Sequence, residues 1–528
     1  MPMATTTRLE WLQLHAVLSN VGRVASASQL RLIVLGLVGT ATASVGWAQS
    51  TLVRPAVQAM SVTTNNVAFT SSDVARSDTV LVVTPRLDLL TSNPNYRLNA
   101  TLAADAVSYL GHTRADRLLP RAQADLSVQL VDRWLFVDST LSATTASSNP
   151  FGVLEEESTS TFNRATVYRE RFSPYVDREL SERERLQLRS DQSWVQNRGA
   201  AGSIAGVNAF QQSQLASYVV SPRPLGFGAE YSREATEYSI ASDPSITFET
   251  ARLSATYEIV PQTILTVIAG RDHARYGSTD ETETLQGVGI RWVPTERTAL
   301  DARVERRFFG TAWQLGLAHR TPFVLADVNL AQRATTYSAQ VASLPAGGDV
   351  AQLLDSMLST RITNAGERAI AVQQLMSERG LPATLTSAQD LFSPTAQLQK
   401  VANVSVALLG SRHTVTLRAF YAHSEDLLGV DPPPLISSDA KQYGASLTLS
   451  RRLQPNTTAD ASITRTRVVG LGTNSNLVTS NQGMRVGVNR VLSPRTTISA
   501  AVRRQLVNST VVDDANQTSF ALGLLHRF

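Results

Sequence analysis

The sequence predicts an all-β protein, a large antiparallel transmembrane β-barrel of about 20–22 strands with a small helical insert. Three observations predict this fold. Most of the chain alternates apolar and polar residues, the links between alternating segments are short and long in turn, and the last alternating segment ends on Phe528. Outer-membrane barrels show these features because their strands face lipid on one side and a wet lumen on the other.

Residues 1–48 have the features of a signal peptide. The apolar run Leu32–Val38 follows Arg31, and small residues precede an expected cleavage after Ala48. The basic region before the run is long, which is compatible with a start downstream of Met1. Beyond the leader no stretch reaches the roughly 20 apolar residues of a spanning helix. We therefore expect a secreted chain that is periplasmic, released or a barrel.

The mature chain divides into four parts. We expect an N-terminal segment at 49–79 with a first strand near Ser61–Thr70, a first barrel part at 80–346, a helical insert at 347–398 and a closing barrel part at 399–528. The alternation is clear where Leu300, Ala302, Val304 and Phe308 alternate with four charged residues. A soluble sandwich would bury such an apolar face, whereas a barrel turns it to lipid.

The lengths of the links between strands predict the topology of the barrel. Tight turns are expected at 131–133, 260–262, 293–296, 453–456 and 492–495, and longer links at 144–160, 197–206, 276–283, 424–438 and 470–481. Short turns belong to the periplasmic side of an outer-membrane barrel and long loops to the extracellular side. The final strand then runs down to the periplasm.

The insert has helical spacing in place of period 2. Leu353, Leu354, Met357 and Leu358 lie on one helical face, and Gly380 to Pro382 end the pattern. The order of turns and loops places the insert on the extracellular side. A packed cap over the rim, a plug inside the pore and a mobile gate remain the alternatives.

Two sets of residues are candidates for function. Phe520, Leu522, Leu524 and Phe528 form an expected C-terminal signal for the barrel assembly machinery. The candidate lumen-facing charges are Asp301, Arg303, Glu305, Arg307 and Arg503. Such charges either set selectivity in a pore or brace neighbouring strands across a wet lumen, and we favour bracing.

The sequence carries no recognisable catalytic chemistry. It has no cysteine, no nucleotide-binding glycine motif, no nucleophile motif, and histidines without metal spacing, so we expect no enzyme, no cofactor and no metal site. The acidic clusters Glu155–Glu157 and Asp280–Glu283 could hold a divalent cation but are more often solvated loop charge. A net charge of +4 is no footprint of nucleic-acid binding. Lys400 and Lys441 are the only lysines.

Several short stretches together resemble an uncharacterised outer-membrane family that accompanies the PEP-CTERM/exosortase exopolysaccharide system. They are Thr63–Val67, Val83–Pro85, Phe162–Arg164, Ser173–Tyr175, Gly287–Pro294, Arg307–Gly310, His319–Arg320 and Arg379–Pro382. Asn65 stands where a common form of the first motif has Asp, and His526 where assembly signals usually have an aromatic residue. The resemblance implies a link to polysaccharide production or export and brings no catalytic residues.

Localisation in the cell outer membrane follows from these observations. Our first hypothesis is a non-enzymatic barrel for exopolysaccharide export or surface assembly. A porin-like channel for small polar solutes and a structural or adhesive surface barrel with a blocked lumen are the alternatives. The expected partners are outer-membrane lipid, the barrel assembly machinery, exopolysaccharide and export-system proteins, with no nucleic acid.

Overall fold

The computed structural model describes residues 51–147, 151–152, 164–198, 208–239, 245–276, 279–342, 396–427, 439–511 and 513–528, together with Leu354, Leu358, Arg368, Ala371, Val372 and Met376. Thr51–Phe528 form one compact unit. The expected signal peptide at 1–48 lies outside the described residues.

Twenty-two strands make a single sheet. The first eleven are β1 (Leu52–Thr64), β2 (Asp78–Ser92), β3 (Tyr96–Tyr109), β4 (Arg117–Val131), β5 (Leu135–Ser147), β6 (Arg164–Glu179), β7 (Glu184–Arg198), β8 (Ala209–Val220), β9 (Leu225–Tyr238), β10 (Ile246–Val260) and β11 (Thr263–Tyr276). The others are β12 (Thr279–Thr295), β13 (Thr298–Arg307), β14 (Gly310–Arg320), β15 (Val324–Thr335), β16 (Gln397–Leu409), β17 (His413–Asp426), β18 (Ala440–Gln454), β19 (Thr457–Gly470), β20 (Val478–Ser493), β21 (Thr496–Ser509) and β22 (Ala515–Arg527). A short helix α3 (Tyr337–Ala342) follows β15, and a 3₁₀ turn η1 (Gly472–Asn474) follows β19.

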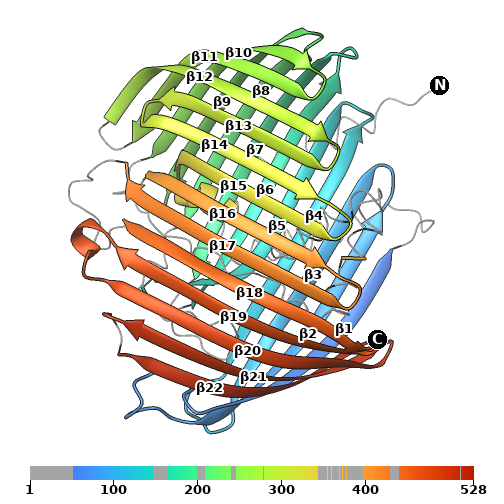
Figure 1. Ribbon diagram of the computed structural model, residues 1–528, viewed down its shortest axis with the longest axis vertical. Helices are drawn as coiled ribbons and strands as arrows, with labels where there is room; N and C mark the ends of the chain where they lie inside the picture. The colour runs from blue at the N-terminus through green and yellow to red at the C-terminus, as the bar shows by residue number, and fades with distance from the viewer. Residues whose placement is uncertain are drawn as a thin grey trace, which may run out of the picture. The chain divides into compact units, whose positions relative to one another are not determined.

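The sheet closes on itself. Each strand pairs antiparallel with its neighbours in the chain, and β1 pairs with β22 from Ala56↔Arg527 to Thr64↔Ser519 (Figure 1). Closure leaves no unpaired sheet edge, so the backbone hydrogen bonds are satisfied within the wall, as lipid requires. The prediction of a large antiparallel barrel is confirmed, at the upper end of the expected strand number.

Most of the links alternate as predicted, but the extracellular links 277–278 and 308–309 have only two residues each. The start of β1 and the end of β22 lie at the same end of the barrel, where β6 joins β7 through residues 180–183 and β10 joins β11 through 261–262. All the tight turns predicted from the sequence lie at this end, which is the periplasmic end by the rule that short turns face the periplasm. The opposite, extracellular end carries the long links, among them 148–163, 336–396 and 427–439.

Two expectations about the strands were wrong. The link expected at 276–283 consists of 277–278 only, because Asp280 and its neighbours already belong to β12. The first strand lies at Leu52–Thr64 and not at Ser61–Thr70. Asn66 ends it, because its amide donates to the Thr70 carbonyl at 2.6 Å and its Oδ1 accepts from Thr70 N at 3.1 Å.

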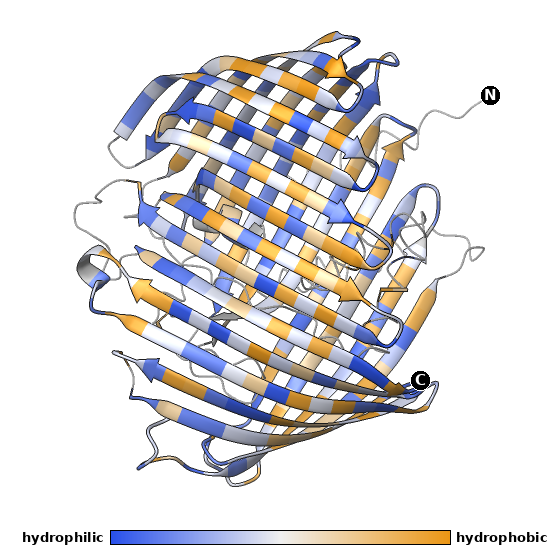
Figure 2. Ribbon diagram, viewed as in Figure 1, coloured by the Kyte–Doolittle hydropathy of each residue, from blue (hydrophilic) through white to orange (hydrophobic). Residues whose placement is uncertain are grey.

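The apolar face of the wall points outward. On β11, Val267 is 62% exposed on the outer face, while the next residue, Ile268, is 4% exposed on the inner face. Hydrophobic and hydrophilic residues alternate in the same way along the other strands (Figure 2). No helix in the described part of the chain is long and apolar enough to cross a membrane. A closed barrel with an apolar outer wall belongs in lipid, and the protein is an outer-membrane β-barrel.

Candidate functional site

The inner wall of β9–β13 carries a network of ion pairs. Arg252 on β10 donates through Nη1 to Glu230 Oε1 at 2.7 Å and through Nε to Glu305 Oε1 at 3.2 Å. Arg303 Nε lies 3.1 Å from the same Glu305 oxygen. Glu305 on β13 therefore serves two guanidinium groups, and it is nearly buried, with 4% of its side chain exposed.

Glycine makes room for this network. The side chains of Arg252 and Glu305 meet although β11 and β12 lie between their strands. A Cβ at Gly287 on β12 would lie 2.7 Å from Glu305 Cγ, so a larger residue would displace the carboxylate. Glycine inside a strand often marks such a close approach, and Gly287 is the signal by which the sequence could have revealed this contact.

A second ion pair lies nearer the extracellular end of the same wall. Arg307 Nε donates to Asp272 Oδ2 at 2.6 Å, and its Nη2 donates to Thr250 Oγ1 at 2.9 Å. Thr250 in turn donates to Asp272 Oδ1 at 2.8 Å. Asp272 is fully buried, so its charge depends on Arg307 for neutralisation.

The structure places all five predicted lumen charges on the inner face. Arg303, Glu305 and Arg307 take part in the two networks. Arg503 on β21 is nearly buried and donates to Gln505 Oε1 at 2.8 Å. Asp301 shares the inward parity of β13 but forms no ion pair with any described residue. The cross-strand partners Arg252, Glu230 and Asp272 were missed, because strand pairing over such distances leaves no local pattern.

A further cluster of charges lies on β5–β7. Arg189 donates through Nε to Asp191 Oδ1 at 3.0 Å and through Nη2 to Asp138 Oδ2 at 3.1 Å. Arg171 Nη2 donates to Asp191 Oδ1 at 2.8 Å. In each of these networks arginine and carboxylate neutralise one another between strands, in several cases across one or two intervening strands.

An aromatic platform adjoins this cluster towards the periplasmic end. The rings of Phe136 on β5 and Tyr175 on β6 stack with centroids 5.2 Å apart and planes 17° apart. The Arg189 guanidinium lies 4.7 Å from the Tyr175 ring centroid. Both rings belong to the inward parity of their strands, since Phe136 and Tyr175 are register partners beside the inward pair Asp138 and Ser173. The lumen thus carries a stacked pair of aromatic rings beside a guanidinium group.

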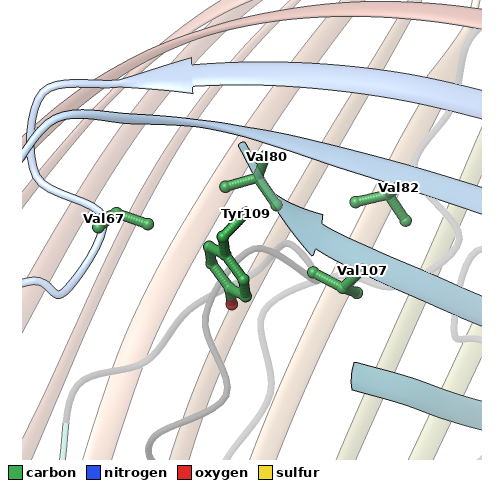
Figure 3. Close-up of a cluster of buried hydrophobic side chains, with 5 residues drawn as sticks. All are labelled: Val67, Val80, Val82, Val107 and Tyr109. Carbon is green, nitrogen blue, oxygen red and sulfur yellow. The ribbon is translucent and has the colours of Figure 1, made fainter. Parts of the chain in front are cut away.

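At the extracellular end, the link after β1 folds over the inner wall. Val67 is 2% exposed and packs on four inward side chains of β2 and β3, which are Val80, Val82, Val107 and Tyr109. In Figure 3 Val67 approaches these side chains from its link. The inner wall of β2 and β3 is therefore apolar where this link covers it.

The link between β5 and β6 reaches much further. Phe151 is 2% exposed and packs against Ala440 and Val468, which face inward from β18 and β19. Its carbonyl oxygen accepts a hydrogen bond from Thr479 Oγ1 on β20 at 2.6 Å. The shorter way round the wall from β5 to β20 passes through β1 and the seam with β22. Phe151, which follows β5 in the chain, therefore contacts the inner wall on the other side of the lumen, at β18–β20.

The link after β15 also enters the lumen. Thr336 Oγ1 donates to Glu234 Oε1 on β9 at 3.3 Å and accepts from Thr236 Oγ1 at 3.4 Å. Strands β10 to β14 lie between β9 and β15 in the wall, so these contacts span the interior. In α3, Gln340 Nε2 donates to Gln397 Oε1 at the start of β16 at 2.8 Å. Together with Phe151, this link covers part of the outer mouth.

The helical insert predicted at 347–398 falls mainly outside the described residues. Those of its residues that are described before 396 have helical backbone: Leu354, Leu358, Arg368, Ala371, Val372 and Met376. Leu354 and Val372 are buried. The choice among cap, plug and gate for the insert as a whole stays open, while the link that leads to it lies inside the ring.

The C-terminal residues face lipid. Phe520, Leu522 and Leu524 are 46%, 51% and 45% exposed on the outer face of β22. Phe528 N donates to the Pro55 carbonyl at 3.0 Å, which secures the chain end at the seam with β1. Recognition of these residues by the barrel assembly machinery remains a prediction.

The acidic clusters hold no metal-like arrangement where they are described. Glu155–Glu157 lie outside the described residues. Asp280 is paired with Arg275 at 3.1 Å and lies 3.5 Å from His273. No group of three or more His, Cys, Asp or Glu side chains with metal-site geometry occurs within the described ranges.

The ion-pair network on β13 makes a stability prediction. Glu305→Ala leaves Arg252 and Arg303 without their shared carboxylate, and we expect the free energy of unfolding to fall by about 3 kcal/mol. Asp301→Ala, four residues earlier on the same face, is the matched control, with an expected change within about 0.5 kcal/mol. Urea unfolding of the barrel in lipid vesicles measures both. Equal effects of the two substitutions would show that the network contributes nothing.

Comparisons with known proteins identify no family. No protein-family model matches the sequence, and no curated protein matches it. Among solved structures, the siderophore receptor PirA from Pseudomonas aeruginosa is 10% identical, with 91% of this chain and 81% of that chain covered and a TM-score of 0.43. The FrpB iron transporter from Neisseria meningitidis (F3-3 variant) is 9% identical, with 90% and 81% covered and a TM-score of 0.48. The ferric citrate transporter FecA is 11% identical, with 90% and 78% covered and a TM-score of 0.44.

Proposed function

We propose that this outer-membrane barrel serves exopolysaccharide export or surface assembly by giving a polar polymer a path through its lumen. The observation that carries the proposal is the inner wall, where paired charges, hydroxyls and amides surround an aromatic platform. Sugars present hydroxyl groups to polar side chains and C–H faces to aromatic rings. Phe136 and Tyr175, with Arg189 beside them, offer both kinds of contact in one place.

Charge pairing in the lumen suits such a substrate. Arg252, Glu305, Arg307 and Asp272 neutralise one another within the wall. A pore that selects ions by charge instead presents a ring of one sign. A lumen with little net field favours a polar substrate that is weakly charged. The family resemblance supports polysaccharide as that substrate and export-system proteins as partners.

The covered mouth distinguishes the proposal from an open porin. Phe151 and Thr336 make their contacts across the extracellular end, so a polymer leaving the lumen has to displace them. The same contacts favour a second candidate, a structural surface barrel whose lumen stays blocked. A steady conductance in planar bilayers would instead support the porin-like channel.

Polymer secretion tests the proposal. Deleting the protein should abolish secretion or surface attachment of the polymer, and Tyr175→Ala should lower the export rate roughly threefold to tenfold, since one aromatic contact contributes about 1 kcal/mol. Leu188→Ala on β7 is the matched control, because Leu188 lies on the outer face and is 43% exposed. Unchanged secretion and attachment in the deletion strain would reject the proposal and leave the structural barrel.

A further inference from the structure

We propose that five cationic side chains on the outer wall of β16–β21 bind the phosphate groups of a phosphorylated lipid in the outer leaflet. This set, the cationic band, consists of Lys400, Lys441, Arg465, Arg467 and Arg504. The proposal concerns the lipid-facing surface and does not depend on what passes through the lumen.

The register places the cationic band on the outer face. Lys441 shares its parity on β18 with Tyr443, which is 42% exposed. Arg465 and Arg467 share theirs on β19 with Ile463, which is 54% exposed. Arg504 and Lys400 follow the same rule, since their strand pairing sets them beside the outward Met484 and His423.

On β18, β19 and β21 the members of the cationic band lie on the extracellular side of exposed apolar or aromatic residues. Towards that end, Tyr443 is followed by Lys441 on β18, Ile463 by Arg465 and Arg467 on β19, and Val502 by Arg504 on β21. Tyr443 is the register partner of Tyr421, so two exposed tyrosines stand at the border. Aromatic residues mark the depth of lipid headgroups, which places the cations where lipid phosphates lie.

The cationic band lacks acidic partners. None of its five members forms an ion pair with a described residue. Two carboxylates lie near its members on β16 and β18: Glu425, 2.7 Å from His423 Nε2, and Asp439 just before β18, which accepts a hydrogen bond from Asp426 N at 2.7 Å. Unpaired cations at headgroup depth are free to bind lipid phosphate.

On another part of the outer wall, cations do form ion pairs with carboxylates. On β9–β12 two outward cations meet carboxylates, with Arg233 at 3.0 Å from Glu249 and Arg275 at 3.1 Å from Asp280. The cationic band is therefore a local excess of positive charge and not a general property of the wall.

A hollow beside the cationic band offers further donors. Arg467 lines it together with Ser480, Gln482, Asn508 and Thr510. Its carboxylate, Asp514, accepts hydrogen bonds from Ser509 N at 3.1 Å and Asn508 Nδ2 at 3.4 Å, and so is occupied within the protein. Hydroxyl and amide groups next to a guanidinium suit a phosphorylated sugar headgroup.

The test compares lipid retention by matched variants. The purified barrel in detergent is mixed with lipid A, a phosphorylated glycolipid, and bound lipid is counted by native mass spectrometry. We expect the triple variant Lys441→Gln, Arg465→Gln, Arg467→Gln to bind about 100-fold more weakly, because each cation at a charged lipid surface contributes about 1 kcal/mol. The control triple variant Arg233→Gln, Arg271→Gln, Arg275→Gln should bind like the wild type.

Three further results decide between the outcomes. Heat-modifiable migration shows that both triple variants are folded. Dephosphorylated lipid A should bind as weakly to the wild type as lipid A does to the cationic-band variant. Inorganic phosphate should leave the lipid bound. Equal retention by both triple variants, equal binding of dephosphorylated lipid, or displacement by inorganic phosphate alone would overturn the proposal.

Discussion

A disulfide that fixes the β15–β16 link to β9 should stop polymer secretion, and a reductant should restore it. Thr236 Oγ1 and Thr336 Oγ1 are 3.4 Å apart, so Thr236→Cys combined with Thr336→Cys brings two sulfurs within bonding reach. The native chain has no cysteine, so these would be its only thiols. The outer membrane faces an oxidising compartment, where the bond would form and persist. A fixed link cannot move aside for a polymer.

A second cysteine pair controls for the disulfide itself. Thr63 and Thr79 on the adjacent strands β1 and β2 have hydroxyls 3.1 Å apart and do not span the lumen. Thr63→Cys with Thr79→Cys should form its bond and leave secretion unchanged. Migration on non-reducing gels reports bond formation in both variants. Continued secretion with the Thr236–Thr336 bond fully formed would mean that the link is no barrier.

An arginine on the outer wall should destabilise the barrel far more than one on the inner wall. Val267 is 62% exposed at the middle of the lipid-facing row of β11. Val267→Arg should lower the free energy of unfolding by about 2–4 kcal/mol, the cost of a guanidinium in the middle of a bilayer. Urea unfolding of the barrel refolded into lipid vesicles measures the change.

The control lies one residue away. Thr266→Arg places the guanidinium on the inner face, where the register partner Gly289 has no side chain. We expect a change within about 1 kcal/mol. Similar losses for both substitutions would contradict the assignment of the two faces.

The fold was predictable because two local features of the sequence indicate it, the alternation of residues along each strand and the composition of the tight turns. Alternation such as Asp301, Arg303, Glu305 and Arg307 follows from the two faces of each strand, and the tight turns carry Pro, Asn and Asp. The first strand was displaced in the prediction because Pro55 interrupts its donors and the Asn66 turn resembles a continuation. The strand boundary at Thr279 was missed because the acidic run there reads as a loop.

The candidate site was predictable only in part. Parity alone assigned Arg303 and Glu305 to the inner face, but their partner Arg252 comes from a strand that is not adjacent. The contacts at the mouth leave no trace in the sequence: Phe151 meets a hydroxyl 328 positions away. Such contacts depend on how a link without periodicity folds, and the aromatic pair of Phe136 and Tyr175 depends on the strand register.

Photocrosslinking from the lumen tests most directly whether a polymer passes through the barrel. p-Benzoylphenylalanine in place of Tyr175 inserts into nearby C–H bonds on irradiation of secreting cells. If the polymer crosses the lumen, the protein should acquire polysaccharide, seen as a high-mass smear that periodate removes. The same group in place of the outward Leu188 should give none. Absence of an adduct at position 175 in cells that secrete normally would contradict passage through the lumen.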